Sequence, residues 1–272
     1  MRTFSATYTD AVKFNRKPNE DYFLASEKYP IFSVADGVTR YVAEDLRYSY
    51  PAGARAAAQI FCQSILEYLE KEFEKGANPQ EETIREALNF ANDRIREMNE
   101  NEGMTKSAIN YRERDFFDCV GVAATISRSA LLYGYLSDCG LALFNKNNEL
   151  LFQTENTLKP IIAPYMQMED VRERRELIKK ELRNNSNGSG YGAFTGEQEA
   201  ALYYRIGTVR VHSEDLIVLY SDGFEPYFQF PEFVNLLRKG NTSTLDAFSA
   251  QKAKENPETF GSDRTVLSIL IS

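Results

Sequence analysis

The spacing of apolar side chains changes several times along this chain of 272 residues. Near the amino end, apolar and polar positions alternate over residues 4–9, 21–26 and 31–35, a pattern typical of antiparallel strands. Apolar residues then recur every three or four positions over residues 52–75 and 81–98, which predicts two amphipathic helices. Because a surface helix ordinarily buries its apolar stripe within its own domain, we expect both helices to cover a sheet.

Strand patterns return after the two helices. Asn147-Asn148 suits a hairpin turn between two of the later strands. The order of elements is therefore β, α, β, α, β. Further strands are predicted at residues 120–126, 130–136, 141–145, 150–154, 216–220 and 265–269.

Residues 157–205 interrupt the strand pattern. Opposite charges recur at three- and four-residue spacing in residues 166–184, which predicts a helix with a solvated face. Asparagine, serine and glycine dominate residues 184–192, as in a mobile loop. Long loops in compact domains are commonly lids or binding elements, so we expect an insertion beside a functional site. The chain length fits one domain, residues 1–272, that carries this insertion.

Carboxylates stand beside glycine or arginine in four segments that are scattered over the chain. Three of these segments border apolar runs, so their acids should lie at strand ends, held by a rigid sheet. Oxygen ligands without a nearby histidine or cysteine suit Mg²⁺ or Mn²⁺, and such ions usually bind substrate phosphate. The pattern predicts metal-assisted attack on phosphorus. The segments contain Arg16, Asn19, Glu20 and Asp21; Asp36 and Gly37; Ser221, Asp222 and Gly223; and Asp263 and Arg264.

Composition excludes several classes of partner. The formal net charge of −8 argues against nucleic-acid backbones and anionic membrane surfaces. No apolar run approaches the ~18 residues that a membrane span needs, and residues 1–10 have no signal-peptide core. Cys62, Cys119 and Cys139 lack metal-type spacing, so we expect buried thiols in a reducing compartment. A cytoplasmic protein is the resulting expectation.

The single histidine, His212, lies in a strand–turn–strand pattern. A Ser-His-Asp or Cys-His mechanism would have to use it, yet no nucleophile elbow accompanies it. We therefore expect a structural or solvent-facing histidine, and a mechanism carried by the acids.

The order and spacing of the acidic segments resemble the metal-dependent Ser/Thr protein phosphatases of the type 2C (PPM) family over almost the whole chain. The stretch that begins Asp118-Cys-Val-Gly121 resembles the family's glycine-threonine strand, and Ser137-Asp138-Cys139 resembles its Gly-Asp-Ser segment. A single Asp-Gly pair can be an ordinary turn, but four acid motifs in family order favour the family. The resemblance implies an α+β fold, a four-layer αββα sandwich of two antiparallel sheets packed face to face and flanked by helices.

The resemblance also implies a two-metal site at one edge of the sandwich. Asp36 would bridge two Mn²⁺ or Mg²⁺ ions, and Asp222 with Asp263 would complete the shell of one ion. Some family members place a ligand of a third ion where Asp118 stands, although a capping aspartate is the alternative at that position. The implied ligands are Glu20, Asp21, Asp36, the carbonyl of Gly37, Asp118, Asp222 and Asp263.

In the family mechanism, a hydroxide bridging the two cations attacks phosphorus, because metal binding lowers the pKa of water from ~15.7 towards ~7. The resemblance therefore implies a catalytic role for Asp36, which would hold both of these cations. Arg16 would hold two phosphoryl oxygens in a bidentate fork, a geometry that lysine does not offer. A surface arginine in a loop is the alternative reading of Arg16.

Two departures from the family pattern bear on the site. Val38-Thr39-Arg40 follow Gly37, where the family commonly has further glycines and sometimes a proton-donating histidine. Without that donor the reaction could lose up to ~10²- to 10⁴-fold. Aligning the last motif on Thr265 puts Ser262 at the ligand position, so either Asp263 reaches the ion from one residue along or that ion is bound more weakly.

The sequence therefore predicts a divergent type 2C phosphatase that acts on phosphoserine or phosphothreonine in protein substrates and in signalling. The alternative is a weakly active or inactive phosphatase-like module that binds a phosphorylated partner. An aspartyl-phosphate mechanism fails on spacing, because it needs an acid two residues after its nucleophile and Asp36 is followed there by Val38.

Overall fold

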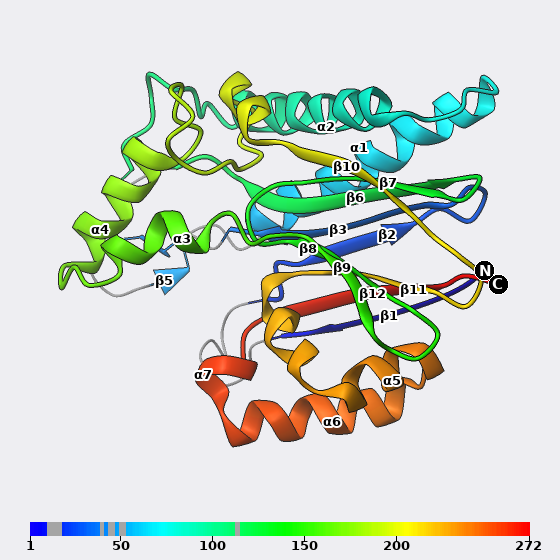
Figure 1. Ribbon diagram of the computed structural model, residues 1–272. Helices are drawn as coiled ribbons and strands as arrows, with labels where there is room; N and C mark the ends of the chain where they lie inside the picture. Colours follow the sequence, from blue (N-terminus) through cyan, green and yellow to red (C-terminus); the bar gives the residue numbers. More distant parts are fainter. Residues whose placement is uncertain (10–17, 39–40, 43–46, 49–52, 112–114) are drawn as a thin grey trace.

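Two antiparallel five-stranded sheets face each other in the computed structural model of the protein (Figure 1). The structure describes residues 1–9, 18–38, 41–42, 47–48, 53–111 and 115–272. The first sheet has the strand order β1-β12-β11-β8-β9, and the second has the order β10-β7-β6-β3-β2. A short pair, β4 (Tyr41–Val42) and β5 (Arg47–Tyr48), stands apart from both.

The first sheet joins the two ends of the chain, because β1 pairs with β12 in the register Arg2 to Leu270. In both sheets the strands match the predicted alternation to within a few residues. The first sheet contains β1 (Arg2–Tyr8), β8 (Gly140–Phe144), β9 (Leu150–Gln153), β11 (Leu216–Tyr220) and β12 (Arg264–Leu270). The second contains β2 (Tyr22–Ala25), β3 (Ile31–Gly37), β6 (Cys119–Ser127), β7 (Ala130–Tyr135) and β10 (Arg205–Arg210).

Helices cover the outer face of each sheet, as Figure 1 shows above and below the strands. The two predicted helices, α1 (Gly53–Glu74) and α2 (Glu81–Asn101), bury their apolar stripes against the second sheet. The first sheet is covered by the 3₁₀ helix η4 (Asp222–Gln229) and by α5 (Pro231–Lys239), α6 (Thr242–Glu255) and α7 (Pro257–Phe260). This arrangement confirms the predicted four-layer αββα sandwich.

Three apolar clusters correspond to the three interfaces between the layers. One lies under α1 and α2, one lies under η4, α5 and α6, and the third fills the space between the sheets. Aromatic rings dominate the second cluster, where Phe224 stacks on Phe233 with centroids 5.2 Å apart. The described cysteines Cys62, Cys119 and Cys139 are free and buried, as expected. None of the helices in the described ranges has the length and apolar composition needed to cross a membrane.

Most of residues 157–205, the segment predicted to be an insertion, lies outside both sheets as short helices and loops at the end of the sandwich opposite the chain termini (Figure 1), and Arg205 begins β10. The charged helix begins at α4 (Val171–Leu177), where Asp170 caps it by accepting from the backbone N–H of Arg172 at 2.8 Å. The other helices of this segment are α3 (Lys159–Ile162) and the 3₁₀, π and 3₁₀ helices η1 (Ala163–Tyr165), η2 (Ile178–Leu182) and η3 (Gln198–Tyr203).

The prediction of a wholly solvated face for residues 166–184 is wrong at two positions. The side chain of Arg183 is 1% exposed and that of Lys179 is 17% exposed. Both cations turn inward because they pair with buried carboxylates at the start of β6. The ion pairs of Lys179 and Arg183 therefore attach this segment to the sandwich, in addition to the covalent connections at its two ends.

Candidate metal centre

Strand ends from both sheets bring the acidic segments to one edge of the sandwich. Tyr22 pairs with Ala35, so Asp21 at the start of β2 lies beside Asp36 at the end of β3. In the facing sheet, Tyr220 pairs with both Val266 and Gly140. The residues just beyond these pairs, Asp222, Asp263 and Asp138, therefore reach the same edge.

Hydrogen bonds between the motifs join the two sheets at this edge. The hydroxyl of Ser221 donates to Oδ2 of Asp21 at 2.7 Å and accepts from the backbone N–H of Thr265 at 2.9 Å. Asn19 accepts from the backbone N–H of Asp21 at 2.8 Å and donates to the hydroxyl of Thr7 at 2.8 Å, and Thr7 in turn meets the hydroxyl of Thr265 at 2.7 Å. Asp21 is thus fixed by Ser221, a residue 200 positions further along the chain.

The carboxylates at the edge disturb one another's ionisation. Burial, and then repulsion by Asp263 and Asp222, raise the pKa of Asp21 to about 7, although hydrogen bonds from Ser221 and Thr265 oppose this. Burial and repulsion by Asp222 raise the pKa of Asp138 to about 8. Burial also raises the pKa of Asp222, against a hydrogen bond with Asp36. These mutual effects show that the five aspartates form one electrostatic unit.

Both Asp-Gly pairs need glycine because another backbone segment approaches closely. A Cβ atom on Gly37 would lie 2.5 Å from the carbonyl oxygen of Ala54 and 2.9 Å from that of Glu20. A Cβ atom on Gly223 would lie 2.1 Å from the carbonyl oxygen of Asp263. The glycines therefore let the acidic segments pack against each other. A ligand role for the carbonyl of Gly37 stays a prediction.

A cavity of about 350 Å³ opens beside the acids. Its lining includes Asp138 and Asp222, two further acids, Glu225 and Glu258, and Ser262. Lys159 of the insertion is the one basic side chain among the described residues that line it. The cavity therefore lies between the acidic edge and the insertion, where a substrate could reach both.

The residues at this edge suit a hard cation. Their donors are all oxygens, which is the set that Mg²⁺ and Mn²⁺ prefer. Oδ1 of Asp21 is buried and has no hydrogen-bond partner, so a carboxylate oxygen remains to be satisfied there. Within the described ranges, no group of three or more histidine, cysteine, aspartate or glutamate side chains is arranged closely enough to hold a metal ion. The acids converge without forming a complete coordination shell.

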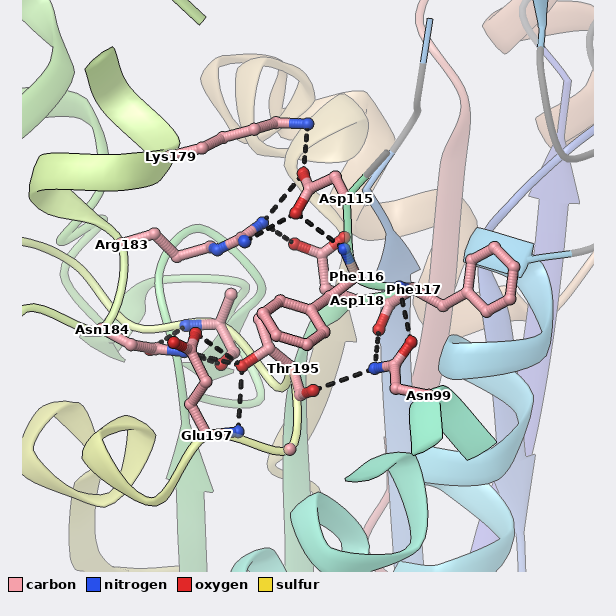
Figure 2. A network of polar contacts seen from close by, with 12 residues as sticks. Asn99, Asp115, Phe116, Phe117, Asp118, Lys179, Arg183, Asn184, Thr195 and Glu197 are labelled. Carbon is pink, nitrogen blue, oxygen red and sulfur yellow. Dashed lines mark hydrogen bonds and ion pairs between the residues drawn. The ribbon is translucent and has the colours of Figure 1, made fainter. Parts of the chain in front are cut away.

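The other predicted site residues differ in their placement. Glu20 is fully buried, and its carbonyl lies next to Gly37. Asp118 is also fully buried, and Oδ2 of its carboxylate accepts from Arg183 at 2.8 Å (Figure 2). Arg16 lies outside the described residues. His212 is exposed at the far end of β11, away from the acids, as expected of a solvent-facing histidine.

Asp138 belongs to the acidic edge but was not among the predicted ligands. The signal was present in Ser137-Asp138-Cys139, which stands where the family has Gly-Asp-Ser. Ser137 has φ of +64°, a left-handed conformation that normally favours glycine. Its hydroxyl donates to the carbonyl of Gly192 at 2.5 Å, and this bond offsets the cost of that conformation. Serine can therefore replace the family's glycine here.

Comparisons with known proteins agree on the class. The protein phosphatase 2C family profile matches residues 14–256. The fold is similar to that of the catalytic domain of the serine/threonine phosphatase PstP in complex with two manganese ions, with a TM-score of 0.64, 14% identity and coverage of 100% of this chain and 98% of that one. No curated protein matches the chain.

Two further solved structures have the same fold. PstP/Ppp of Mycobacterium tuberculosis gives a TM-score of 0.64 at 16% identity, covering 100% of this chain and 99% of that one. MsPP of Mycobacterium smegmatis, a PPM Ser-Thr phosphatase in complex with cacodylate, gives 0.55 at 17% identity, covering 100% and 99%. The fold is that of a type 2C phosphatase domain. The chain belongs to the protein phosphatase 2C family, as a divergent member.

The raised carboxyl pKa values predict how stability depends on pH in excess chelator. The folded chain holds protons on Asp21 and Asp138 that the unfolded chain releases near pH 4, so folding binds protons between about pH 4 and pH 8. The free energy of unfolding should therefore fall as pH rises through this window, by up to about 1.4 kcal/mol per pH unit for each group. Urea titrations at pH 5.5, 7 and 8.5 measure this. Asp138→Asn should flatten the slope, and a wild-type stability that rises with pH would contradict the assignment.

The left-handed backbone of Ser137 predicts different costs for two substitutions. Ser137→Ala keeps the unfavourable φ and loses the bond to Gly192, so it should lower the free energy of unfolding by about 1–2 kcal/mol. Ser137→Gly loses the same bond but relieves the backbone, so its loss should be smaller by about 1 kcal/mol. Denaturant titration of both variants makes the comparison, and an alanine variant as stable as the glycine variant would show that the conformation carries no cost.

Proposed function

We propose that this protein hydrolyses phosphoserine and phosphothreonine esters in protein substrates with the help of two Mn²⁺ or Mg²⁺ ions. The observation that carries the proposal is the meeting of Asp21, Asp36, Asp222 and Asp263 at one edge, beside a cavity and with one buried carboxylate oxygen unsatisfied. The membership of the family supports it, and so do the two manganese ions in the PstP structure. We also propose a cytoplasmic location.

Each acid has a proposed place in the reaction. Asp36 is beside Asp21 across the β2–β3 pair and has a hydrogen bond with Asp222, which would suit it to bridge two ions. Asp222 and Asp263 would hold one ion, and Glu20 or Asp21 the other, with the carbonyl of Gly37 as a further ligand. When bound, such a pair of ions lowers the pKa of water and polarises the phosphoryl group.

The surrounding residues orient these ligands. The hydroxyl of Ser221 fixes Oδ2 of Asp21, and Oδ1, which has no hydrogen-bond partner, would be available to hold an ion. Gly223 lets Asp222 approach the backbone of Asp263. Asp138, which lines the cavity, adds a further negative oxygen near Asp222. We propose it as an additional ligand, because hard-cation sites gain affinity with each charged oxygen.

Two basic residues are proposed to contact the substrate. Arg16 remains our candidate for the bidentate phosphate clamp on the strength of the family motif. Lys159 faces the same cavity from α3 and could attract the phosphoryl group before it reaches the ions. His212 is at the opposite end of the sandwich, so it is not positioned to protonate the leaving group.

A phosphatase-like module that binds a phosphorylated partner without turnover is the second candidate. Ser262 and the missing glycines after Gly37 favour it, because each departs from the family motif. The convergence of the acids favours catalysis. Hydrolysis of para-nitrophenyl phosphate and of a phosphothreonine peptide, with and without Mn²⁺, separates the two functions.

Metal dependence provides the main test of the proposal. Asp36→Asn should lower kcat by at least ~10³-fold while the fold survives, because the amide keeps the shape but removes the charge that balances a dication. Excess chelator should have the same effect on the wild type. Asp93→Asn is the matched control, since Asp93 is half exposed in an α2 ion pair with Arg96. An Asp36→Asn enzyme as active as that control would exclude the proposed centre.

The last motif allows a second test, on the offset between Ser262 and Asp263. Asp263 is 8% exposed and close enough to Asp21 to raise its pKa, whereas Ser262 lines the cavity. If Asp263 is the ligand, Asp263→Ala should raise the Mn²⁺ concentration for half-maximal rate by ~10-fold or more, and Ser262→Ala should change it little. Ser262→Asp should tighten Mn²⁺ binding if the shell is incomplete. Equal Mn²⁺ titrations for all three variants would mean that this motif holds no ion.

A further inference from the structure

A buried cluster of four charges joins the insertion to the start of β6 (Figure 2). Nη2 and Nη1 of Arg183 donate to the two oxygens of Asp115 at 2.7 and 3.2 Å, and Nη1 also donates to Asp118 at 2.8 Å. Nζ of Lys179, one helical turn earlier, lies 2.5 Å from Asp115. We call these four residues the Arg183 cluster.

Among the residues that the structure describes, the Arg183 cluster brings opposite charges together, and three of its four side chains are buried. Two cations face two carboxylates, and the side chains of Arg183, Asp115 and Asp118 are 1%, 6% and 0% exposed. The guanidinium also lies over the ring of Phe116, with its carbon 5.8 Å from the ring centroid. Because a buried charge is costly without a partner, each member of the cluster holds the others in place.

Asp118 connects this cluster to the acidic edge. Its backbone carbonyl accepts from the N–H of Val38 at 3.0 Å, directly after Asp36-Gly37. The next residue, Cys119, pairs with Gly37 across the two strands. Cys119 also exchanges two backbone hydrogen bonds with Phe194 of the insertion, at 3.3 and 2.9 Å. Asp118 is therefore joined through backbone hydrogen bonds both to the end of β3 and to the segment that contains Phe194.

The insertion is held to the same region at its other points. Thr157, at its start, donates its backbone N–H to the carbonyl of Ser137 at 3.0 Å, and the Ser137 hydroxyl binds Gly192 near its end. Asn99 of α2 donates to the carbonyls of both Phe117 and Thr195, at 2.8 and 2.9 Å (Figure 2). Without Arg183, however, the charged helix of the insertion would keep only Lys179 as an ion-pair contact to the sandwich among the described residues.

We propose that Arg183 is an internal cation that locks residues 157–205 against the end of β3, and that Asp118 is a positioning residue in this lock and not a metal ligand. The proposal rests on the proposed function for its effect on catalysis. A divalent ion at Asp118 would have to displace a guanidinium that is almost entirely buried. It would also place two positive charges beside the guanidinium of Arg183.

The test compares Arg183→Gln, Asp118→Asn and their double variant in the full chain. Lys180→Gln is the control, because Lys180 is the neighbouring cation on the same helix but is 62% exposed. Hydrogen exchange should follow the amides of Asn184, Tyr191 and Phe194, which the attached insertion protects through bonds to Tyr191, Leu182 and Cys119. We expect exchange there to rise by about ten-fold or more in each single variant, with no change in the control. The double variant should exchange less than the two effects combined predict.

Calorimetric titration with Mn²⁺ alone tests whether Asp118 is a positioning residue, which anchors the segment 157–205, or a metal ligand. If Asp118 is an anchor, Asp118→Asn should keep the Mn²⁺ stoichiometry and change the affinity by less than about three-fold. For the phosphothreonine peptide, KM should rise by about ten-fold, with a smaller change in kcat. Arg183→Lys keeps the charge but not the bidentate fork, so it should show intermediate exchange and KM values. It also serves as the second variant if Arg183→Gln does not fold.

Two results would overturn the proposal. One is the loss of a bound Mn²⁺ ion in Asp118→Asn, which would make Asp118 a ligand. The other is unchanged exchange at Asn184, Tyr191 and Phe194 in both single variants, which would mean that the Arg183 cluster does not hold the insertion. Neither hydrogen exchange nor calorimetry needs turnover. A chain without phosphatase activity would therefore contradict the proposed function, while these two measurements would still test the role of the Arg183 cluster.

Discussion

Carboxylates crowded at one edge of the sandwich repel one another, and the fold must hold them there against that repulsion. The effect is visible in the raised pKa values of Asp21, Asp138 and Asp222. Opposing it are the rigid strand ends and the Ser221 hydroxyl, which ties Asp21 of one sheet to the strands of the other. The edge is therefore stabilised by the rest of the molecule, and a cation that neutralised it would stabilise the whole domain.

The strand and helix layers could be predicted from the sequence because their cause is local. The almost continuous burial of β3 and β6 and the buried helical stripe of α1 each result from packing against neighbouring layers. The helices α5 and α6 were not predicted individually. In α6 only Leu245, Phe248 and Ser249 are buried. The helix therefore has too few buried positions to show an apolar stripe in the sequence. Its place depends on tertiary contacts with η4 and α5 that no local pattern encodes.

The acidic edge was predicted in part, for a similar reason. Asp36 and Asp222 each stand beside a glycine, and the structure shows that both glycines accommodate a close backbone approach. Asp138 has no such neighbour, because Ser137 takes the left-handed conformation that a glycine would otherwise mark. The inward turn of Arg183 depends on carboxylates 65 and 68 positions earlier in the chain, and charge spacing along one helix does not reveal them.

The position of β12 has a consequence for the order of folding. This strand lies between β1 and β11, so the first strand of the chain has no neighbour until residues 264–270 are available. The same strand brings Thr265 to orient Ser221, and it follows directly on Asp263. Contacts between such distant segments form late, because closing a long loop costs entropy before any contact repays it. Most of the acidic residues of the edge are therefore synthesised long before the contacts that bring them together can form. The acidic edge is completed only when synthesis reaches β12.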